Sequence, residues 1–293
     1  MKKKILIITL SNIGDAVMTT PVLLHVLKKY KNPVIDLVCD RRSSDLFNYF
    51  PNIRNIFLKD KKRGLLSHLK LIKKLRSTKY DIAIDLRTDV LLYFIKAYKK
   101  FFKINNDKIH SVEKHFLSYE KKISLIQMPK IYIPEYIDKK IKKYMSRARK
   151  KNISLSLGAN SQHKIWPLKK YVKLINLLQD KINKIYLLGD EKDKMIADNF
   201  EKYVKVETLN LCGKLSIMET AAVIKQSDFF IGNDSGLGHI ASAVRTPSFT
   251  IFGEGDPNRY KPYGIEAFFY QSKEKDISKI NPNDFYYDLS ELL

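Results

Sequence analysis

Short apolar runs that alternate with longer amphipathic stretches constrain the fold of this chain more than any other feature. The first half opens with an apolar run at residues 4–9, and residues 16–29 then carry apolar side chains at helical spacing. Further apolar runs follow at 34–39, 53–58 and 82–86. Strands that alternate with helices form parallel βαβ units, because each helix returns the chain to the same edge of the sheet. The pattern therefore predicts a doubly wound α/β sheet.

The same alternation resumes after a less regular middle section. Residues 90–102 and 112–125 are apolar and predict helices, and residues 137–150 predict a basic helix or linker. Four further strands are predicted at 153–157, 184–188, 229–231 and 248–252. The chain has 293 residues, about twice the usual domain size of roughly 150. We therefore divide it into two α/β domains of similar architecture, residues 1–150 and 151–293.

The composition is that of a folded protein from a reducing compartment. Hydrophobic residues make up 44%, enough to offset the entropy lost on folding, which excludes a disordered chain. The two cysteines, Cys39 and Cys212, form no disulfide framework, and no Cys/His cluster has zinc-ligand spacing. The apolar run after the first lysines is short and is soon followed by Asp15, so it predicts a buried strand and not a secretion signal. We expect a cytoplasmic protein.

A large positive charge is the strongest bias in the composition. The chain carries 54 Lys+Arg against 31 Asp+Glu, a formal net charge of +23. Three explanations stay open: a solvated lysine-rich surface, attraction to an anionic membrane surface or phosphorylated acceptor, and nucleic-acid binding. Nucleic acid ranks last, because no recognisable nucleic-acid-binding module accompanies the basic runs. No apolar run approaches the roughly 18 residues that span a bilayer, so membrane contact would be peripheral.

The loop after the first predicted strand holds a candidate catalytic carboxylate. It reads Ser11-Asn12-Ile13-Gly14-Asp15 and follows the carboxyl end of a strand, where open α/β sheets bind ligands. Gly14 permits a tight turn and the close approach of a ligand. Asp15 is either a helix cap or a carboxylate aimed into the cleft between the domains as a general base. The G-x-G-x-x-G fingerprint of dinucleotide-binding proteins is absent here.

A loop early in the second half has the composition of a phosphate-binding site. Residues 158–167 bring Asn160, Ser161 and Lys164 close to the start of a predicted helix, together with Trp166. Small residues, amide and hydroxyl side chains and a lysine suit the binding of phosphate oxygens. The alternative is a polar turn with a solvated lysine and a tryptophan packed in the core.

A second candidate loop, residues 232–239, follows the strand predicted at 229–231. It places Asp234, Ser235 and several backbone N–H groups at the N-terminus of a helix, where unpaired donors and a partial positive charge favour phosphate. The alternative is an ordinary helix N-cap. For His239 we favour a structural role, because a lone histidine on an apolar helix is more often a core residue than a ligand.

An acidic pair follows the strand predicted at 184–188. Asp190 and Glu191 are either ligands of a ribose or parts of a simple turn. The G-x-S-x-G, Walker A and H-E-x-x-H motifs are all absent from the sequence, which removes the enzyme classes that depend on them.

Together and in this order, the motifs resemble glycosyltransferase family 9, the bacterial ADP-heptose:lipopolysaccharide heptosyltransferases. The opening at residues 7–21, the segments 81–87 and 110–113, and Lys164-Ile165-Trp166-Pro167 each look like a motif of that family. The longest similarity runs over residues 232–264, with G-N-D-S-G, H-x-A-x-A, T-P, F-G and D-P in succession. The resemblance covers nearly the whole chain, and several motifs in order are more specific than any one alone.

The resemblance implies a GT-B architecture, in which two Rossmann-like domains face each other across a cleft. The first domain would hold the acceptor and the second the nucleotide-sugar donor. The resemblance also implies that Asp15 is the catalytic base and that Lys164 contacts the donor phosphates. The other implied donor-binding residues are Asn160, Ser161, Asp190, Glu191, Asp234, Ser235, Gly236 and Leu237, and the acceptor-binding residues are Ser11, Asn12, Gly14 and Arg87.

The expected reaction is an inverting transfer of a heptose or related sugar to a lipopolysaccharide core acceptor. Lys164 and the helix N-terminus would stabilise the departing nucleoside diphosphate, so the reaction requires neither a cofactor nor a divalent metal. The acceptor would be a phosphorylated glycolipid, reached by peripheral contact with the anionic inner face of the cytoplasmic membrane, and no nucleic acid is expected. Two alternatives stay open: a non-catalytic basic protein on the same scaffold that binds anionic glycolipid or membrane, and a sugar-nucleotide epimerase.

Overall fold

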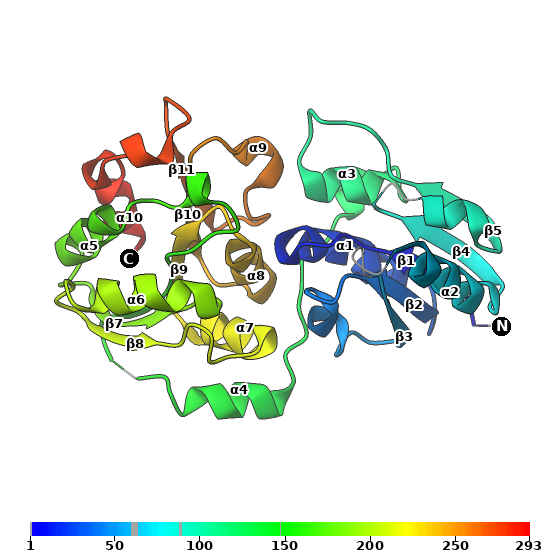
Figure 1. Ribbon diagram of the computed structural model, residues 1–293, viewed down its shortest axis with the longest axis horizontal. Coiled ribbons are helices and arrows are strands. Elements are labelled where there is room, and N and C mark those ends of the chain that lie inside the picture. The colour runs from blue at the N-terminus through cyan, green and yellow to red at the C-terminus, as the bar shows by residue number, and fades with distance from the viewer. Residues whose placement is uncertain (1, 60–63, 88–89, 147) are drawn as a thin grey trace. The chain divides into compact units, whose positions relative to one another are not determined.

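The computed structural model describes residues 2–59, 64–87, 90–146 and 148–293, which form two compact α/β units (Figure 1). The first unit ends at Tyr132 and the second begins at Ile133. Each unit is built on one parallel sheet with helices on its faces, as the alternating pattern predicts. In the described parts of the chain, no helix combines the length and the apolar character that crossing a membrane requires.

The first unit contains a five-stranded parallel sheet in the order β3-β2-β1-β4-β5. Its strands are β1 (Lys4–Ile8), β2 (Val34–Cys39), β3 (Ile53–Leu58), β4 (Tyr80–Asp85) and β5 (Ala97–Phe102). Its helical segments are α1 (Ile13–Lys29), η1 (Ser44–Phe47), α2 (Gly64–Arg76), η3 (Val90–Phe94), α3 (Ser111–Leu117) and η4 (Ile123–Leu125). The crossover from β1 to β2 runs toward one edge of the sheet, and the crossover from β3 to β4 runs in the opposite direction. Because both crossovers are right-handed, α1 and α2 lie on opposite faces of the sheet.

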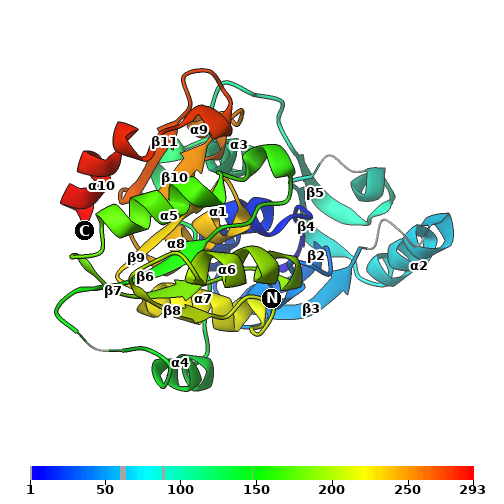
Figure 2. The ribbon, with the colours of Figure 1, turned by 60° about the vertical axis from the view of Figure 1, so that its left-hand side comes forward.

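The second unit contains a six-stranded parallel sheet in the order β11-β10-β9-β6-β7-β8. Its strands are β6 (Lys151–Ser156), β7 (Ile182–Leu187), β8 (Glu207–Asn210), β9 (Phe229–Asn233), β10 (Ser248–Phe252) and β11 (Ala267–Gln271). Its helices are α4 (Glu135–Lys142), α5 (Leu168–Leu177), α6 (Lys194–Glu201), α7 (Ile217–Gln226), α8 (Gly236–Val244), α9 (Pro257–Tyr260) and α10 (Tyr286–Leu292). Figure 2 shows α5 and α6 in front of this sheet, where buried side chains of both helices pack on the strands.

The structure corrects the helix expected at residues 90–102. This segment is a short 3-10 turn, η3, followed by β5, the edge strand of the first sheet. Lys96, Lys99 and Lys100 interrupt the apolar residues of this segment, and pairing with β4 decides the conformation in favour of a strand. The helix expected at 112–125 is shorter than predicted, because α3 ends at Leu117. The sequence analysis also leaves out β8 and β11, which lie at the two edges of the second sheet.

The two compact units divide earlier than the boundary expected near Lys150. The reason is α4, which packs against α7 of the second unit. Lys140 Nζ lies 2.5 Å from Glu219 Oε1, and Lys225 forms an ion pair with Asp138. These contacts attach α4, the first part of the predicted basic linker, to the second unit.

Candidate active site

The second unit joins its two candidate phosphate-binding loops through an ion pair. The loop from β6 to α5 contains a 3-10 turn at Gln162–Lys164, which directs Lys164 toward the end of β9. Lys164 Nζ lies 2.5 Å from Asp234 Oδ2. The lysine side chain is 34% exposed and the aspartate 12% exposed, so the pair is partly buried but keeps a solvent-accessible cation. The structure thus brings together two charged groups that lie 70 residues apart in the sequence.

The buried amide side chain of Asn233, next to Asp234, links the β6–α5 loop to the end of β9. Its Oδ1 accepts hydrogen bonds from the Trp166 backbone N–H (3.1 Å) and the Tyr171 hydroxyl (2.8 Å), and its Nδ2 donates to Leu157 O (2.8 Å) and Gly158 O (3.3 Å). The Asn233 side chain is completely buried. Since a buried polar group that loses its partners is costly, this network holds the β6–α5 loop against the end of β9.

The N-terminus of α8 faces the same edge of the sheet. Ser235 is its N-cap residue, with extended backbone and no capping hydrogen bond from its side chain. Within the described residues, the buried Ser235 Oγ finds no hydrogen-bond partner. The first N–H groups of a helix also lack acceptors inside the helix and carry a partial positive charge. These unpaired donors, next to Lys164, form a site suited to an anion such as a diphosphate.

The two neighbouring acidic residues Asp190 and Glu191 have different surroundings. Asp190 caps the turn η6 (Glu191–Asp193): its Oδ1 accepts from the Lys192 N–H at 2.8 Å, and Asp193 Oδ2 accepts from the Asp190 N–H at 3.0 Å. Burial raises the pKa of Asp193. Glu191, in contrast, has a 75% exposed side chain that lies 3.8 Å from Lys194 Nζ. Of the two, Glu191 therefore presents its carboxylate to solvent.

A glycine in left-handed backbone leaves room for Glu191. Gly213 follows β8 with a φ of +72°, a conformation that costs residues with a side chain roughly 1–2 kcal/mol. A Cβ at this position would collide with the Glu191 carboxylate. The turn after β8 thus leaves space for the Glu191 carboxylate, which a side chain at position 213 would occupy.

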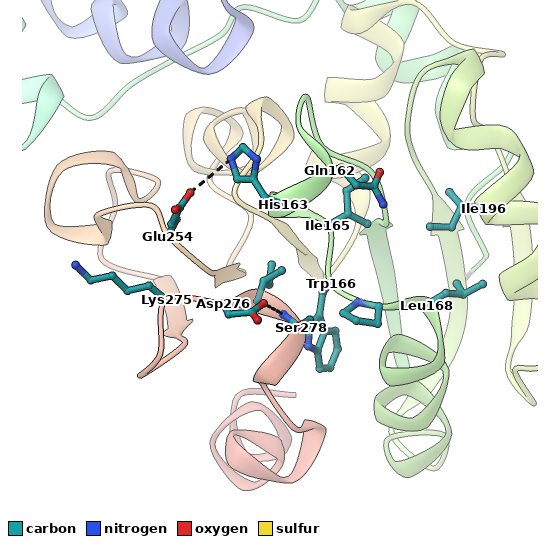
Figure 3. A pocket seen from close by; sticks show the side chains of 12 residues that line it. Gln162, His163, Ile165, Trp166, Leu168, Ile196, Glu254, Lys275, Asp276 and Ser278 are labelled. Carbon is teal, nitrogen blue, oxygen red and sulfur yellow. Dashed lines mark hydrogen bonds and ion pairs between the residues drawn. The ribbon is translucent and has the colours of Figure 1, made fainter.

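An open cavity of about 560 Å³ lies beside the β6–α5 loop, at the buried Trp166 (Figure 3). Figure 3 shows His163 and Glu254 directed toward each other across its upper part, and their Nε2 and Oε2 atoms lie 3.9 Å apart. The Trp166 indole N–H donates to Ile280 O at 3.1 Å. The packing of Trp166 in the core agrees with the structural alternative for this residue.

In the first unit, Asp15 lies in the first turn of α1, not at its cap. Asn12 is the N-cap residue, and its Nδ2 donates to Asp15 Oδ2 at 2.9 Å. Asp15 is half-buried, Ser11 is half-buried and Gly14 is buried. The Asn12 amide thus holds the carboxylate at the carboxyl edge of the sheet, and the helix N-terminus stabilises its charge.

Cationic side chains gather at this edge of the first sheet. Arg87 follows β4, which pairs with β1, and its backbone N–H donates to Asp85 Oδ1 at 2.8 Å. Burial lowers the pKa of Arg87, while the charge of Asp40 opposes that change. Lys103 follows β5; burial and Lys114 lower its pKa, and Asp15 lies near enough to oppose them. Arg87 and Lys103 therefore supply positive charge at the same edge of the sheet as Asp15, which favours an anionic ligand.

The described residues contain no group of three or more His, Cys, Asp or Glu side chains placed to hold a metal ion. The cysteines Cys39 and Cys212 are free and buried, and burial raises the pKa of each thiol to about 12.

The model of the family described as "Glycosyltransferase family 9 (heptosyltransferase)" matches residues 110–284. This chain belongs to glycosyltransferase family 9. Lipopolysaccharide heptosyltransferase 1 of Campylobacter coli is 26% identical over 290 residues, which cover 85% of this chain and 84% of the relative.

Solved structures show the fold of this family 9 glycosyltransferase. A family 9 glycosyltransferase from Veillonella parvula aligns with a TM-score of 0.86 at 17% identity, over 99% of this chain and 97% of that one. The Escherichia coli heptosyltransferase WaaC with ADP aligns with a TM-score of 0.79 at 19% identity, over 99% and 100% of the two chains. The expected GT-B type of α/β fold is confirmed. So is the expected enzyme class, which sets aside the non-catalytic and epimerase alternatives.

Sequence reasoning missed two residues that position the loop of Lys164 in this glycosyltransferase. Asn233 and Tyr171 connect the loop of Lys164 to the end of β9, yet neither was singled out. The available signal was an amide at the end of an otherwise apolar strand, directly before Asp234. A buried amide at such a place requires partners, and they lie in the neighbouring loop.

Proposed function

We propose that this glycosyltransferase transfers a heptose from ADP-heptose to a lipopolysaccharide core acceptor with inversion at the anomeric carbon. The observation that carries the proposal is the Lys164–Asp234 pair at the N-terminus of α8, held in place by the buried Asn233. The names of the relatives support the sugar and the acceptor, and the ADP in the WaaC structure supports the nucleotide.

In this proposal the second unit binds the donor through its diphosphate. The Lys164 ammonium and the N–H groups of Gly236 and Leu237 neutralise the phosphate oxygens, and the unpaired Ser235 hydroxyl donates a further hydrogen bond. Asn160, which is exposed, and Ser161, which is half-buried, lie on the same loop as Lys164 and offer additional polar groups. Asp234 orients Lys164 and accepts from sugar hydroxyls.

Glu191 is the better candidate for the ribose. The Asp190 carboxylate already accepts the Lys192 N–H as a cap, whereas the Glu191 carboxylate is exposed next to Gly213. A free carboxylate can accept hydrogen bonds from both hydroxyls of a ribose. We therefore assign the ribose to Glu191 and a supporting role to Asp190.

Asp15 of the first unit acts as the general base. Its carboxylate takes the proton of an acceptor hydroxyl while that oxygen attacks the anomeric carbon, and the bond from this carbon to the diphosphate oxygen breaks as ADP leaves. One displacement inverts the configuration. Lys164 and the α8 N-terminus stabilise the negative charge that develops on the leaving diphosphate, the step at which preorganised cations contribute most. The proposal needs no metal ion for this step.

The acceptor in this proposal is a phosphorylated glycolipid on the inner face of the cytoplasmic membrane. Ser11, Asn12, Gly14 and Arg87 lie at the carboxyl edge of the first sheet, together with Asp15. The net charge of +23 favours an anionic acceptor and an anionic surface around it.

The proposal is tested by the affinities for ADP, UDP and GDP, measured by titration calorimetry on the wild-type protein and on Lys164→Ala. We expect ADP to bind most tightly, and Lys164→Ala to weaken ADP by about 10- to 100-fold, because a hydrogen bond to a charged group contributes roughly 1.5–3 kcal/mol. The matched control is Lys169→Ala, which removes an exposed lysine of α5 and should leave ADP binding unchanged. Equal affinities for the three nucleotides, or ADP binding that survives Lys164→Ala, would overturn the assignment.

A further inference from the structure

One surface of the first unit exposes many apolar side chains, although its helices are otherwise packed. We call it the α2–β5 surface, after the elements that form it together with η3. Its exposed apolar residues are Leu66, Leu69, Val90, Tyr93, Phe94, Tyr98 and Phe102. Leu66, Val90 and Tyr98 are 74%, 68% and 70% exposed. A cluster of apolar side chains on a solvent-exposed surface is typical of a site that binds another protein, a ligand or a membrane.

These side chains are not a displaced part of the core. The core-facing side of α2 contributes Leu71 and Leu75, which are buried against the sheet, and η3 buries Leu91 and Leu92 in the same cluster. Because residues three and four apart share one face of a helix, Leu66 and Leu69 lie on the opposite, outward stripe. The exposed residues therefore form a second, outward apolar face.

Specific contacts join the η3 and β5 parts of this outward face. The rings of Tyr93 and Phe102 lie 5.1 Å apart, which joins η3 to β5. Lys100 Nζ donates to Tyr93 O at 3.4 Å, and Lys79 Nζ lies 4.4 Å from the centre of the Tyr98 ring. Strand alternation places Tyr98, Lys100 and Phe102 on the same side of β5.

The segments that form this surface, 64–80 and 90–102, contain no aspartate or glutamate. Their cations are Lys70, Lys73, Lys74, Arg76, Lys79, Lys96, Lys99 and Lys100. On α2 the outward stripe begins with Leu66 and Leu69 and continues with Lys70 and Lys73. Aliphatic and aromatic side chains on segments whose charged residues are all cations are complementary to an anionic lipid surface, in which the apolar groups enter the headgroup region and the cations meet lipid phosphates.

We propose that the α2–β5 surface docks this protein onto an anionic lipid bilayer. The rings of the surface could also stack on nucleic-acid bases, but Leu66, Leu69 and Val90 could not, and these exposed aliphatic side chains favour a bilayer as the partner. The inference deepens the proposed function, since an enzyme that modifies a lipid-anchored acceptor works at the bilayer surface. It is nevertheless separable from that function, because docking requires neither donor nor acceptor.

The test is flotation of the full-length protein with vesicles that contain no glycolipid and no sugar nucleotide. We expect at least tenfold more protein bound to phosphatidylglycerol/phosphatidylethanolamine vesicles than to phosphatidylcholine vesicles. Tyr93→Ser/Phe94→Ser should reduce the bound fraction at least fivefold. The matched control, Met195→Ser/Tyr203→Ser, removes two exposed apolar side chains of the second unit and should bind like wild type.

The charge contribution is tested in the same assay with Lys70→Glu/Lys74→Glu on α2 and, as a control with the same spacing on α5, Lys169→Glu/Lys173→Glu. Only the α2 pair should abolish binding to anionic vesicles. An unchanged urea unfolding transition shows that each variant is folded, because the proposed ADP site lies in the other unit. Equal binding to both kinds of vesicle would overturn the proposal, and so would an equal loss of vesicle binding in variant and control. The proposal would also fail if the α2–β5 variants abolished binding of a 20-nucleotide oligomer while vesicle binding persisted. If vesicle binding fails while ADP binds as expected, docking is wrong and the proposed function stands.

Discussion

The two units share one fold but differ in where a fully buried polar side chain finds its partners. In the first unit, Asp36 is almost completely buried within β2 and accepts from Arg54, Asn55 and Tyr80. These partners lie on β3 and early in β4, away from the carboxyl ends of the strands. In the second unit, the buried Asn233 finds its partners at the carboxyl end of β9.

The position of each cluster along the strands indicates its role: contacts near the start of the strands stabilise the sheet, whereas contacts at the carboxyl ends can build a ligand site. Ligands of open α/β sheets bind at the carboxyl edge, and there the second unit already holds Lys164, Asp234 and the α8 N-terminus in place. The first unit holds Asp15 through a hydrogen bond from Asn12, three residues away, and Lys103 lies near its charge. The proposed donor side is thus preorganised by contacts between residues far apart in the sequence, whereas the hydrogen bond to the proposed base comes from the N-cap of its own helix.

The largest expected effect comes from Asp15→Asn. The substitution keeps the size of the side chain but removes the base, so the turnover number should fall about 100- to 10,000-fold. The affinity for ADP should stay within about twofold, because the donor site belongs to the other unit. Initial rates and titration calorimetry check both, and Asp45→Asn, an exposed carboxylate of η1, serves as control. Turnover within tenfold of wild type would show that Asp15 is not the base.

The next effect concerns stability alone. Asp36→Ala should lower the free energy of unfolding of the first unit by about 3 kcal/mol, because Arg54, Asn55 and the buried Tyr80 lose their acceptor. Asp36 also raises the pKa of Arg54 through their hydrogen bond, which marks a strong pair. Urea unfolding followed by circular dichroism measures the loss, with Asp45→Ala as the exposed control. ADP affinity should be unchanged, and a large loss of ADP binding would contradict the separation of roles.

Asn233→Ala should affect both properties of the second unit. It leaves the Tyr171 hydroxyl and backbone groups of the β6–α5 loop without partners, at a cost of about 2 kcal/mol in unfolding free energy. The freed loop should also weaken ADP binding about tenfold, since Lys164 is no longer held in place. Urea unfolding and calorimetry test this, and Asn258→Ala in the exposed α9 loop is the control. If ADP affinity does not change, Asn233 is a structural residue only.

The smallest effect is a pH dependence confined to the first unit. His115 of α3 is buried, and burial, with Lys103 and Lys114, lowers its pKa to about 3. The unfolded chain takes up the proton near pH 6.5 while the folded chain does not, so stability is full above that pH and falls as the pH decreases toward 3. Between pH 6.5 and 5.5 we expect a loss of about 1 kcal/mol.

Hydrogen exchange of the α3 amides at the two pH values measures this loss. His115→Met fills the same space without a titratable ring and should flatten the pH dependence. A loss of equal size in His115→Met would assign the effect to other groups, such as His25, whose pKa burial and Lys29 also lower.

Much of the fold was predictable because the apolar pattern of buried parallel strands is strong. Runs such as 34–39 and 248–252 became β2 and β10 as expected. The strands that were missed, β5, β8 and β11, all lie at sheet edges, where one side of the strand is half exposed and the pattern becomes mixed. Edge strands are specified by pairing with a neighbour, which a local pattern does not reveal.

For the candidate site, the sequence allowed us to predict which loops form it but not which side chains in those loops contact one another. Topology alone places residues 158–167 and 232–239 at one edge, because β6 and β9 are adjacent and parallel. The pairing of Lys164 with Asp234 depends on the path of the loop across β9, and the role of Asn233 depends on the register that brings it to Gly158 O. Our proposal of Glu191 in place of Asp190 for the ribose rests on the capping role of Asp190, a local contact visible only once the turn is formed.

Trp166 has a consequence of its own. It is the single tryptophan of the chain, it is fully buried, and it lies two residues after Lys164, with its backbone attached to Asn233. Excitation that selects tryptophan over the 17 tyrosines therefore reports on the loop that carries Lys164. If the donor binds there as proposed, we expect arrival and departure of the nucleotide to change this emission in stopped-flow on unlabelled enzyme.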